Sequence, residues 1–407
     1  MRILVQKYGG SSLATLAKVR AVAERVARTY KAGNRLAVVL SAQGDTTDEL
    51  LALAAEMSGV PHRRELDQLL ATGECRSIVL LVLALHELGV PAISLTGPQA
   101  GINAVGKHGE AFISDIDTGR IQRLLDQGQV VVVAGFQGIN ADGDIATLGR
   151  GGSDTTAVAL AAALRADRCE IYTDVDGVYT ADPRTVPTAR PLSIVDPGVL
   201  AELTFAGAKV VHARAVELAA MEQVAVWVGG SFSDTPGTVV PARSDEVMLE
   251  TRSAVVAVAH DTDVARVLVR TDAGSADPTP ELLAILARHA VPVDLVARSG
   301  PHEDEYRVGF TIRGTDADEV LSTLHPVGVA KGWQIRVDTD VAKLSLVGMG
   351  LLTRPDYASR LLATLAADGI TTSWVSISQL RISAVIRADR IEKAVFAVHR
   401  EFQLEAE

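Results

Sequence analysis

Short apolar segments rich in β-branched residues alternate with longer helical patterns from the first residue to about residue 240. The pattern predicts strands at residues 3–5, 36–40, 92–95, 130–133 and 170–172, and helices at residues 17–30, 76–88 and 153–164. This alternation is typical of a mainly parallel sheet with helices on both faces. We therefore expect a three-layer α/β domain over residues 1–243 and a linker at the polar residues 244–252.

The pattern changes after residue 253. Strand, helix, strand, strand, helix and strand are predicted in turn at residues 264–269, 280–289, 291–297, 306–312, 317–324 and 333–337. The order starts again at residue 342, with elements at residues 344–347, 358–367, 371–377, 380–386 and 391–402. This repeat predicts two ferredoxin-like α+β modules, at residues 253–338 and 339–407. The last strand of the second copy is not visible, so another segment would have to supply it.

Composition limits the possible classes of function. Basic residues number 39 and acidic residues 50, and the net charge of −11 disfavours a surface for nucleic acid or anionic lipid. The longest strictly apolar run, residues 78–85, is too short for a membrane span, and the N-terminus does not read as a signal peptide. Two cysteines, Cys75 and Cys169, fit a reducing compartment. We expect a cytoplasmic protein without a transmembrane helix.

A glycine-rich loop at residues 7–12 follows the first predicted strand. It places Lys7 beside Gly9 and Gly10, so that an ammonium group and backbone amides could meet phosphate oxygens. Taken alone, the loop could equally be a structural turn.

A second such loop, residues 148–156, lies between a strand-like region and a helix. Arg150 can bind a carboxylate or phosphate bidentately, and the glycines let a ligand approach the backbone. Ser153 or Asp154 is the expected N-cap of the helix. Together, the two loops are a more specific signal than either one.

Three further features have both a functional and a plain structural interpretation. Residues 172–184 combine acids, an aromatic, a proline turn and an arginine after an apolar strand, which could also be a polar β-turn. Glu74 is expected at the start of a long apolar helix, where a carboxylate interacts favourably with the helix dipole. Lys209 begins a helical pattern and could be a solvated lysine.

Two nucleotide or metal motifs are excluded. Residues 101–108 approximate a Walker A loop, but His108 stands where a magnesium-binding Ser or Thr is required. The nine histidines show no paired ligand spacing, which argues against a zinc site.

In their order and spacing, the motifs resemble those of aspartate kinases of the amino-acid kinase family. The resemblance rests on residues 7–12, 73–74, 96–101, 149–156 and 172–184. The two downstream modules look like the paired ACT domains of the same enzymes. The resemblance implies phosphorylation of the β-carboxylate of L-aspartate by ATP, as the first step towards lysine, threonine and methionine.

The resemblance also implies a catalytic group. Lys7 and Lys209 would neutralise charge on the transferring phosphoryl group, and Asp154 would orient these lysines. Gly9 and Gly10 would donate backbone amides to the phosphates.

Separate residue sets would hold the two substrates. Aspartate would be bound through its α-ammonium group by Glu74, through its α-carboxylate by Arg150, and by the hydroxyl groups of Ser41, Thr47 and Ser153. The nucleotide would lie among Thr173, Asp174, Tyr179 and Arg184. Mg²⁺ would bridge the phosphate oxygens of ATP without a direct protein ligand.

The regulatory half departs from the family pattern at residues 274–280 and 293–299, where the usual proline-glycine turn and asparagine-containing strand are missing, and at residues 354–357 and 371–374, where bulkier side chains occur. Bulkier side chains there would clash with an amino-acid inhibitor, and missing polar groups would leave the inhibitor's polar groups without hydrogen-bond partners. Our hypothesis is that feedback inhibition by lysine or threonine is weakened or lost. Neutral drift is the alternative.

Other interpretations of the chain as a whole remain open. A kinase-fold enzyme for another acid or nucleotide would not need Glu74 together with Arg150, and an inactive amino-acid-binding regulatory subunit would be expected to lack Lys7 or Asp154. We expect a homo-oligomer, or an α2β2 assembly in which a regulatory subunit starts internally at Met248.

Overall fold

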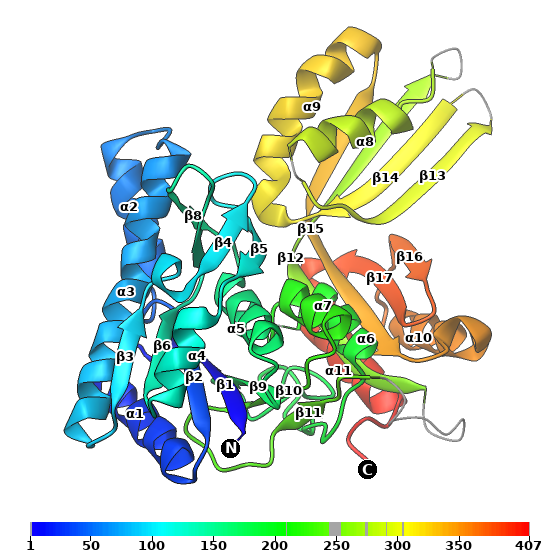
Figure 1. The fold of residues 1–407 in the computed structure, drawn as a ribbon. Coiled ribbons are helices and arrows are strands. Elements are labelled where there is room, and N and C mark those ends of the chain that lie inside the picture. Colours follow the sequence, from blue (N-terminus) through cyan, green and yellow to red (C-terminus); the bar gives the residue numbers. More distant parts are fainter. Residues whose placement is uncertain are drawn as a thin grey trace. The chain divides into compact units, whose positions relative to one another are not determined.

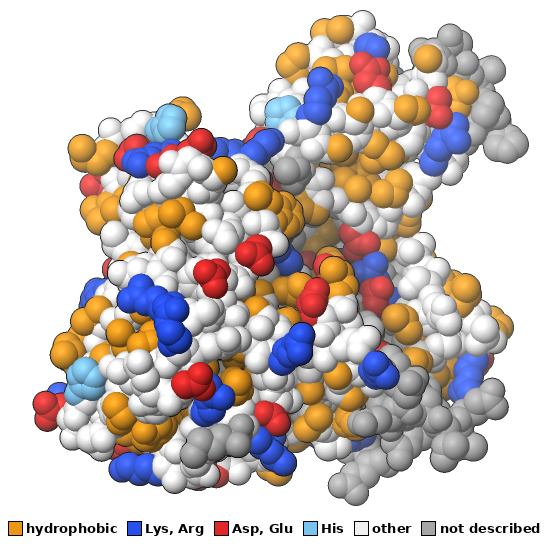
Figure 2. Space-filling model, viewed as in Figure 1, with side chains coloured by type: hydrophobic (Ala, Val, Ile, Leu, Met, Phe, Trp, Pro, Cys, Tyr) orange, Lys and Arg blue, Asp and Glu red, His pale blue; other side chains and the backbone are white. Residues whose placement is uncertain are grey.

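The computed structural model describes residues 2–208, 210–243, 254–272, 276–289, 291–302 and 305–406. These residues form two compact units (Figure 1). Unit 1 comprises Met1–Tyr179, Pro191–Phe205 and Lys209–Arg252, and unit 2 comprises Thr180–Arg190, Ala206–Ala208 and Ser253–Glu407. On the face seen in Figure 2, basic, acidic and apolar side chains are interspersed. The linker expected at residues 244–252 lies outside the described residues.

A seven-stranded sheet forms the centre of unit 1, with strand order β11-β10-β9-β1-β2-β6-β3. Its strands are β1 (Ile3–Tyr8), β2 (Arg35–Leu40), β3 (Ala92–Leu95), β6 (Val130–Ala134), β9 (Arg168–Thr173), β10 (Val226–Gly230) and β11 (Thr238–Val240). Its strand pairs are parallel apart from β10 with β11. A second sheet contains β4 (Ile102–Val105), β5 (Phe112–Ile116), β7 (Gln137–Ile139) and β8 (Ile145–Thr147).

Helices cover both faces of the seven-stranded sheet (Figure 1). On one face, α1 (Leu16–Lys31) and α3 (Arg63–Glu87) bury an apolar cluster that includes Leu4 and Tyr8 of β1. The helix α5 (Gly152–Ala163) packs against β1, β2 and β9. The other helices of this unit are α2 (Thr46–Met57), α4 (Gly119–Asp126), α6 (Pro197–Phe205) and α7 (Ala213–Met221). Since side chains alternate along a strand, Lys7 points away from the α1–α3 cluster.

The helix α3 differs from its prediction. The apolar pattern indicated only the part from residue 76, because the preceding turns contain many polar residues, and it put Glu74 at the helix start. This was wrong, because the helix begins at Arg63 and Glu74 lies in its middle. Among the described residues, α3 is also the one helix long and apolar enough to span a membrane. Half of its apolar window is buried inside the protein, as in the core helix of a soluble domain.

Unit 2 contains a six-stranded antiparallel sheet with strand order β13-β14-β12-β15-β17-β16. Its strands are β12 (Val255–Asp272), β13 (Asp294–His302), β14 (Glu305–Ile312), β15 (Gln334–Gly348), β16 (Trp374–Ile377) and β17 (Arg381–Arg387). Its helices are α8 (Thr279–Arg288), α9 (Ala317–Lys331), α10 (Pro355–Ala367) and α11 (Ile391–Glu401). The long strands β12 and β15 run through both predicted modules.

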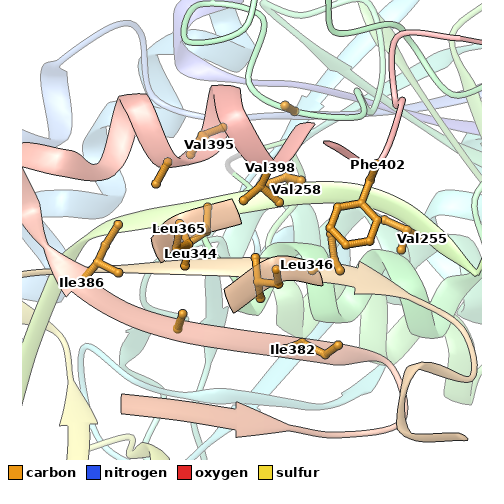
Figure 3. Close-up of a cluster of buried hydrophobic side chains, with 14 of the residues drawn as sticks. Val255, Val258, Leu344, Leu346, Leu365, Ile382, Ile386, Val395, Val398 and Phe402 are labelled. Atoms are coloured by element: carbon orange, nitrogen blue, oxygen red, sulfur yellow. The ribbon is translucent and has the colours of Figure 1, made fainter. Parts of the chain in front are cut away.

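The missing strand of the second module comes from the beginning of β12. Residues 257–261 pair with residues 343–347 of β15, ahead of the part of β12 that belongs to the first module. Figure 3 shows Val255 and Val258 in the apolar core of the second module, together with Leu344 and Leu346. The sequence left open which segment supplies this strand, and the structure shows that it comes from the same chain.

A segment from the middle of the chain also belongs to unit 2. Ala181 and Val186, from Thr180–Arg190, are part of the core of the second module. The hydroxyl group of Thr180 shares a buried hydrogen bond of 2.9 Å with Nε2 of His399 on α11. The C-terminal part of the predicted nucleotide segment is therefore anchored in the regulatory half.

We predict that Asp294→Asn destabilises unit 2 by about 1–3 kcal/mol at pH 7, less than for a fully buried ion pair because about a third of the Asp294 side chain is exposed. The Asp294 carboxylate accepts hydrogen bonds from buried Lys343 and from Arg381, at 2.9 Å each. Burial raises the pKa of Asp294, but the two cations lower it further, for a net decrease. The ionised carboxylate therefore stabilises the fold above the pKa of the unfolded chain, and this stabilisation is lost as pH falls through the folded pKa.

Urea unfolding at several pH values would test this prediction. Asp368→Asn is the matched control, because Asp368 pairs with the half-exposed Lys393 on the surface. The difference in free energy of unfolding between wild type and Asp294→Asn should become smaller towards low pH. Equal urea midpoints for Asp294→Asn and Asp368→Asn at pH 7 would contradict the prediction.

Candidate active site

A cavity of about 670 Å³ lies in unit 1 where β1 and β2 end and α5 begins. Its lining includes all the residues predicted to bind aspartate and most of those predicted for catalysis: Lys7, Gly9, Gly10, Ser41, Thr47, Glu74, Arg150, Ser153 and Asp154. The loops after β1 and β2 touch here, since a Cβ at Gly10 would come within 2.8 Å of the Ala42 carbonyl oxygen. Parallel sheets commonly bind ligands at this edge.

An ion pair links β1 to α5 inside the cavity. The Lys7 ammonium lies 2.5 Å from Oδ1 of Asp154, and both side chains are nearly buried. The other oxygen, Oδ2, accepts a hydrogen bond of 3.0 Å from the backbone amide of His212. Asp154 thus fixes the Lys7 ammonium and also holds the chain just after residue 209. Lys209 itself lies outside the described residues.

The start of α5 is packed tightly between neighbouring loops. Its N-cap is Gly151, not Ser153 or Asp154 as predicted, and both of those residues lie in the first turn. Gly151 has a φ of 72°, and a Cβ there would come within 2.0 Å of the His212 ring. A glycine can adopt this conformation and leave room for the imidazole, whereas a capping serine or aspartate could not. The helix N-terminus consequently faces the cavity.

Glu74 enters the cavity from the middle of α3. Its side chain is 3% exposed, and Oε1 accepts a hydrogen bond of 3.0 Å from the backbone amide of Ala42. Within the described part of the chain, the buried atom Oε2 has no hydrogen-bond partner. Burial raises the pKa of Glu74 from its ordinary 4.5 to about 7, although backbone hydrogen bonds oppose this. An unpartnered buried carboxylate oxygen is suited to a ligand that brings a positive charge.

Arg150 lies on the exposed side of the same cavity, in the loop before α5. Its guanidinium has no hydrogen-bond or ion-pair partner among residues that the structure describes. Its five N–H donors are therefore available to an anionic ligand. A ligand with both an ammonium and a carboxylate group would find a partner for each in this cavity.

Of the residues predicted for nucleotide binding, Lys7, Gly9 and Gly10 line this cavity, whereas Thr173, Asp174, Tyr179 and Arg184 do not. Thr173 ends β9, where its carbonyl oxygen accepts a hydrogen bond from the Ser231 amide. Thr173, Asp174 and Tyr179 belong to unit 1, whereas Arg184 belongs to unit 2 and pairs with Asp182 at 3.1 Å. The nucleotide set therefore stays a prediction.

Comparison with protein families matches residues 2–230 to the amino acid kinase family and residues 344–402 to an ACT domain. Curated aspartokinases from Geobacillus stearothermophilus and Thermus thermophilus are 43% and 42% identical to this chain. Both alignments cover 100% of the chain, with 98% of the first relative and 100% of the second. The chain belongs to the aspartokinases of the amino acid kinase family.

A solved aspartokinase has the same fold. The structure of E. coli aspartokinase III in complex with aspartate and ADP, in its R-state, gives a TM-score of 0.84 at 26% identity. The match covers 98% of this chain and 99% of that one. The predicted α/β domain with ACT modules is confirmed, as is the prediction of an aspartokinase rather than an inactive regulatory subunit.

Two residues of this aspartokinase cavity were missed. Asp67 is 1% exposed and accepts hydrogen bonds from Nδ1 of His108 at 2.8 Å and from the Thr147 hydroxyl at 2.6 Å. It thereby positions the loop that contains His108, which lines the cavity. The sequence contained a signal for Asp67, because this residue precedes Glu74 by seven positions and therefore lies on the same face of α3. Arg63, at the start of α3, adds a second arginine to the lining, and its sequence context gave no signal.

Proposed function

We propose that this chain transfers the γ-phosphoryl group of ATP to the β-carboxylate of L-aspartate, giving β-aspartyl phosphate and ADP. The observation that carries the proposal is the cavity that combines the Lys7–Asp154 ion pair with the unpartnered oxygen of Glu74. Glu74 would bind the α-ammonium group of aspartate and Arg150 its α-carboxylate. Hydroxyl contacts would come from Ser41, Thr47 and Ser153.

The reaction needs positioning and charge neutralisation more than proton transfer. The β-carboxylate of aspartate has a reference pKa of about 3.9 and is ionised at neutral pH. One of its oxygens attacks the γ-phosphorus atom, and the bond from that phosphorus to the β–γ bridging oxygen breaks, leaving ADP. Lys7 would neutralise the phosphoryl oxygens during transfer, together with Lys209. Asp154 is a positioning residue for Lys7 and not a base.

The phosphates of ATP would meet the amides of Gly9 and Gly10 and the ammonium of Lys7. The rest of the nucleotide would contact Thr173, Asp174, Tyr179 and Arg184. Described residues include no group of three acidic, histidine or cysteine side chains arranged to hold a metal. Mg²⁺ would accompany the phosphates of ATP and supply further neutralisation of their charge.

Trapping of the acyl phosphate as a hydroxamate tests the function. ATP-dependent hydroxamate should form with L-aspartate, and much less should form with succinate, which lacks the α-ammonium group. Absence of product with L-aspartate at saturating ATP and Mg²⁺ would reject the proposal. Equal rates with aspartate and succinate would reject the role of Glu74.

We predict that lysine and threonine, singly or together at millimolar concentration, do not inhibit the activity. Both oxygens of Asp294 are already occupied by Lys343 and Arg381, and the Trp374 ring packs against Leu295 and neighbouring apolar residues. An amino-acid effector that required the Asp294 carboxylate would therefore find both of its oxygens occupied. Inhibition by either amino acid, or by the pair alone, would overturn the prediction.

We further propose that the enzyme is cytoplasmic and oligomeric. An assembly with a separate regulatory subunit would require translation to start at Met248, which lies outside the described residues. Intact-mass analysis of protein expressed from the whole gene would separate the two forms. A single mass would exclude the internal start and leave the homo-oligomer.

A further inference from the structure

The sheet of the first ACT module has one face covered by helices and one face that carries arginines. On β12, Val267 and Val269 point into the core with α8 and α9, and Arg266 and Arg270 therefore point to the opposite face. The same alternation holds on β14 and β15, where Arg307 and Arg336 lie next to core residues.

A cavity of about 430 Å³ lies on this arginine face. Five arginines line it: Arg266, Arg270, Arg298, Arg307 and Arg336. Among the pairs formed by described residues, Arg266 lies 2.9 Å from Asp338 and Arg298 lies 2.7 Å from Asp277. The cavity therefore has an excess of positive charge, and its volume is in the range of small-molecule sites.

The strand register brings like charges together. Arg270 on β12 stands directly opposite Arg307 on β14, and like charges in such a pair destabilise a sheet. Arg336 lies on the other side of β12, opposite Leu268. The guanidinium groups of Arg270 and Arg336 have no ion-pair or hydrogen-bond partner in the described ranges. A bound anion would reduce the repulsion between these guanidinium groups.

An aromatic wall closes one side of the cavity. Trp374 of β16 contributes to the lining, and it lies so close to β14 that a Cβ at Gly309 would come within 2.4 Å of its ring. Gly309 faces Leu268 between the two arginine-bearing positions of β12. The glycine therefore makes room for the indole beside the arginines. The indole ring therefore bounds the cavity on one side of the arginine face.

We propose that this cavity binds a small polyanion with at least two phosphate or carboxylate groups. Guanidinium groups bind both kinds of anion bidentately, and a ligand with several charges could bridge Arg270, Arg307 and Arg336. The cavity is separate from the proposed aspartate site, which lies in unit 1. Phosphorylated and polycarboxylate metabolites share the required chemistry.

The test uses the full chain with inorganic triphosphate and with citrate, each titrated calorimetrically at constant ionic strength. A double variant, Arg270→Gln with Arg336→Gln, removes the two unpartnered cations. Arg288→Gln is the control, because Arg288 is exposed at the end of α8 in the same unit. Titrations in a Lys7→Met background remove binding of triphosphate at the catalytic lysine.

At least one anion should bind the wild type and Arg288→Gln equally, and at least tenfold more weakly to the double variant. If only triphosphate binds, the natural ligand is a phosphorylated metabolite. If only citrate binds, the natural ligand is a polycarboxylate. Without anion, the double variant should unfold at a higher temperature than wild type, whereas a purely structural role for the arginines predicts a lower one. No binding of either anion, or equal binding to the double variant, would overturn the proposal.

Discussion

Lys7→Met is expected to lower kcat by about 100- to 1,000-fold, the loss typical when one preorganised group that stabilises transition-state charge is removed. The ammonium of Lys7 is nearly buried and held 2.5 Å from Asp154, so it is fixed before substrates arrive. Methionine retains most of the side-chain length but has no charge. The KM for aspartate should change little, because the groups proposed to bind its ends are Glu74 and Arg150.

Lys18→Met is the matched control for this prediction. Lys18 lies on α1, is half-buried and donates to the Ser11 carbonyl oxygen, and it does not line the cavity. Steady-state kinetics of the two variants, with circular dichroism to verify folding, would decide the question. A kcat for folded Lys7→Met within threefold of wild type would remove Lys7 from the catalytic group.

Glu74→Gln should raise the KM for L-aspartate about 100-fold at pH 8, corresponding to about 2.7 kcal/mol of binding free energy. The loss is of this size because a buried carboxylate would otherwise contact an ammonium group. The KM for ATP should stay unchanged. Glu65→Gln is the control, since Glu65 is on the same helix but paired with Arg64 at the surface.

The pH dependence gives a second readout on Glu74. Its folded pKa is about 7, so the carboxyl is largely protonated below that pH and must lose a proton to bind an ammonium group. The wild-type KM for aspartate should therefore fall as pH rises through 7, by up to about tenfold per pH unit below it. The variant should show no such change. A wild-type KM that is flat between pH 6 and 8 would contradict the proposed contact.

The same raised pKa affects stability with a definite sign. Between pH 4.5 and about 7, the unfolded chain has lost the proton of Glu74 while the folded chain retains it. The free energy of unfolding should therefore fall as pH rises through this interval and level off above it. Glu74→Gln should remove this contribution.

Local patterns were sufficient for much of the fold. The run of valines in β6 and the edges of β3 were predicted closely, because buried parallel strands are short and continuously apolar. The start of α3 was not predicted, because its first turns bury only one side of the helix and contain polar residues such as Arg63 and Asp67. The site gained most from the family resemblance, which brought Glu74 to the cavity even though its expected place on the helix was wrong.

Long-range pairing set the limit of prediction. The first residues of β12 look like the beginning of the first module, and nothing in their local pattern shows that they pair about 85 residues later with β15. The anchoring of Thr180 to His399 is equally invisible in the sequence. Both contacts depend on the tertiary structure, which local periodicity does not contain.

The sharing of the strand β12 by the two ACT modules has an evolutionary consequence. The second module needs residues encoded ahead of the first, so a deletion or duplication that began at the apparent boundary near residue 339 would leave β15 without its neighbour β12. An unpaired strand of this length is an aggregation hazard. The two modules should therefore be inherited, lost or transferred to other enzymes as a pair. The shortest segment that can be transferred intact should include all of β12.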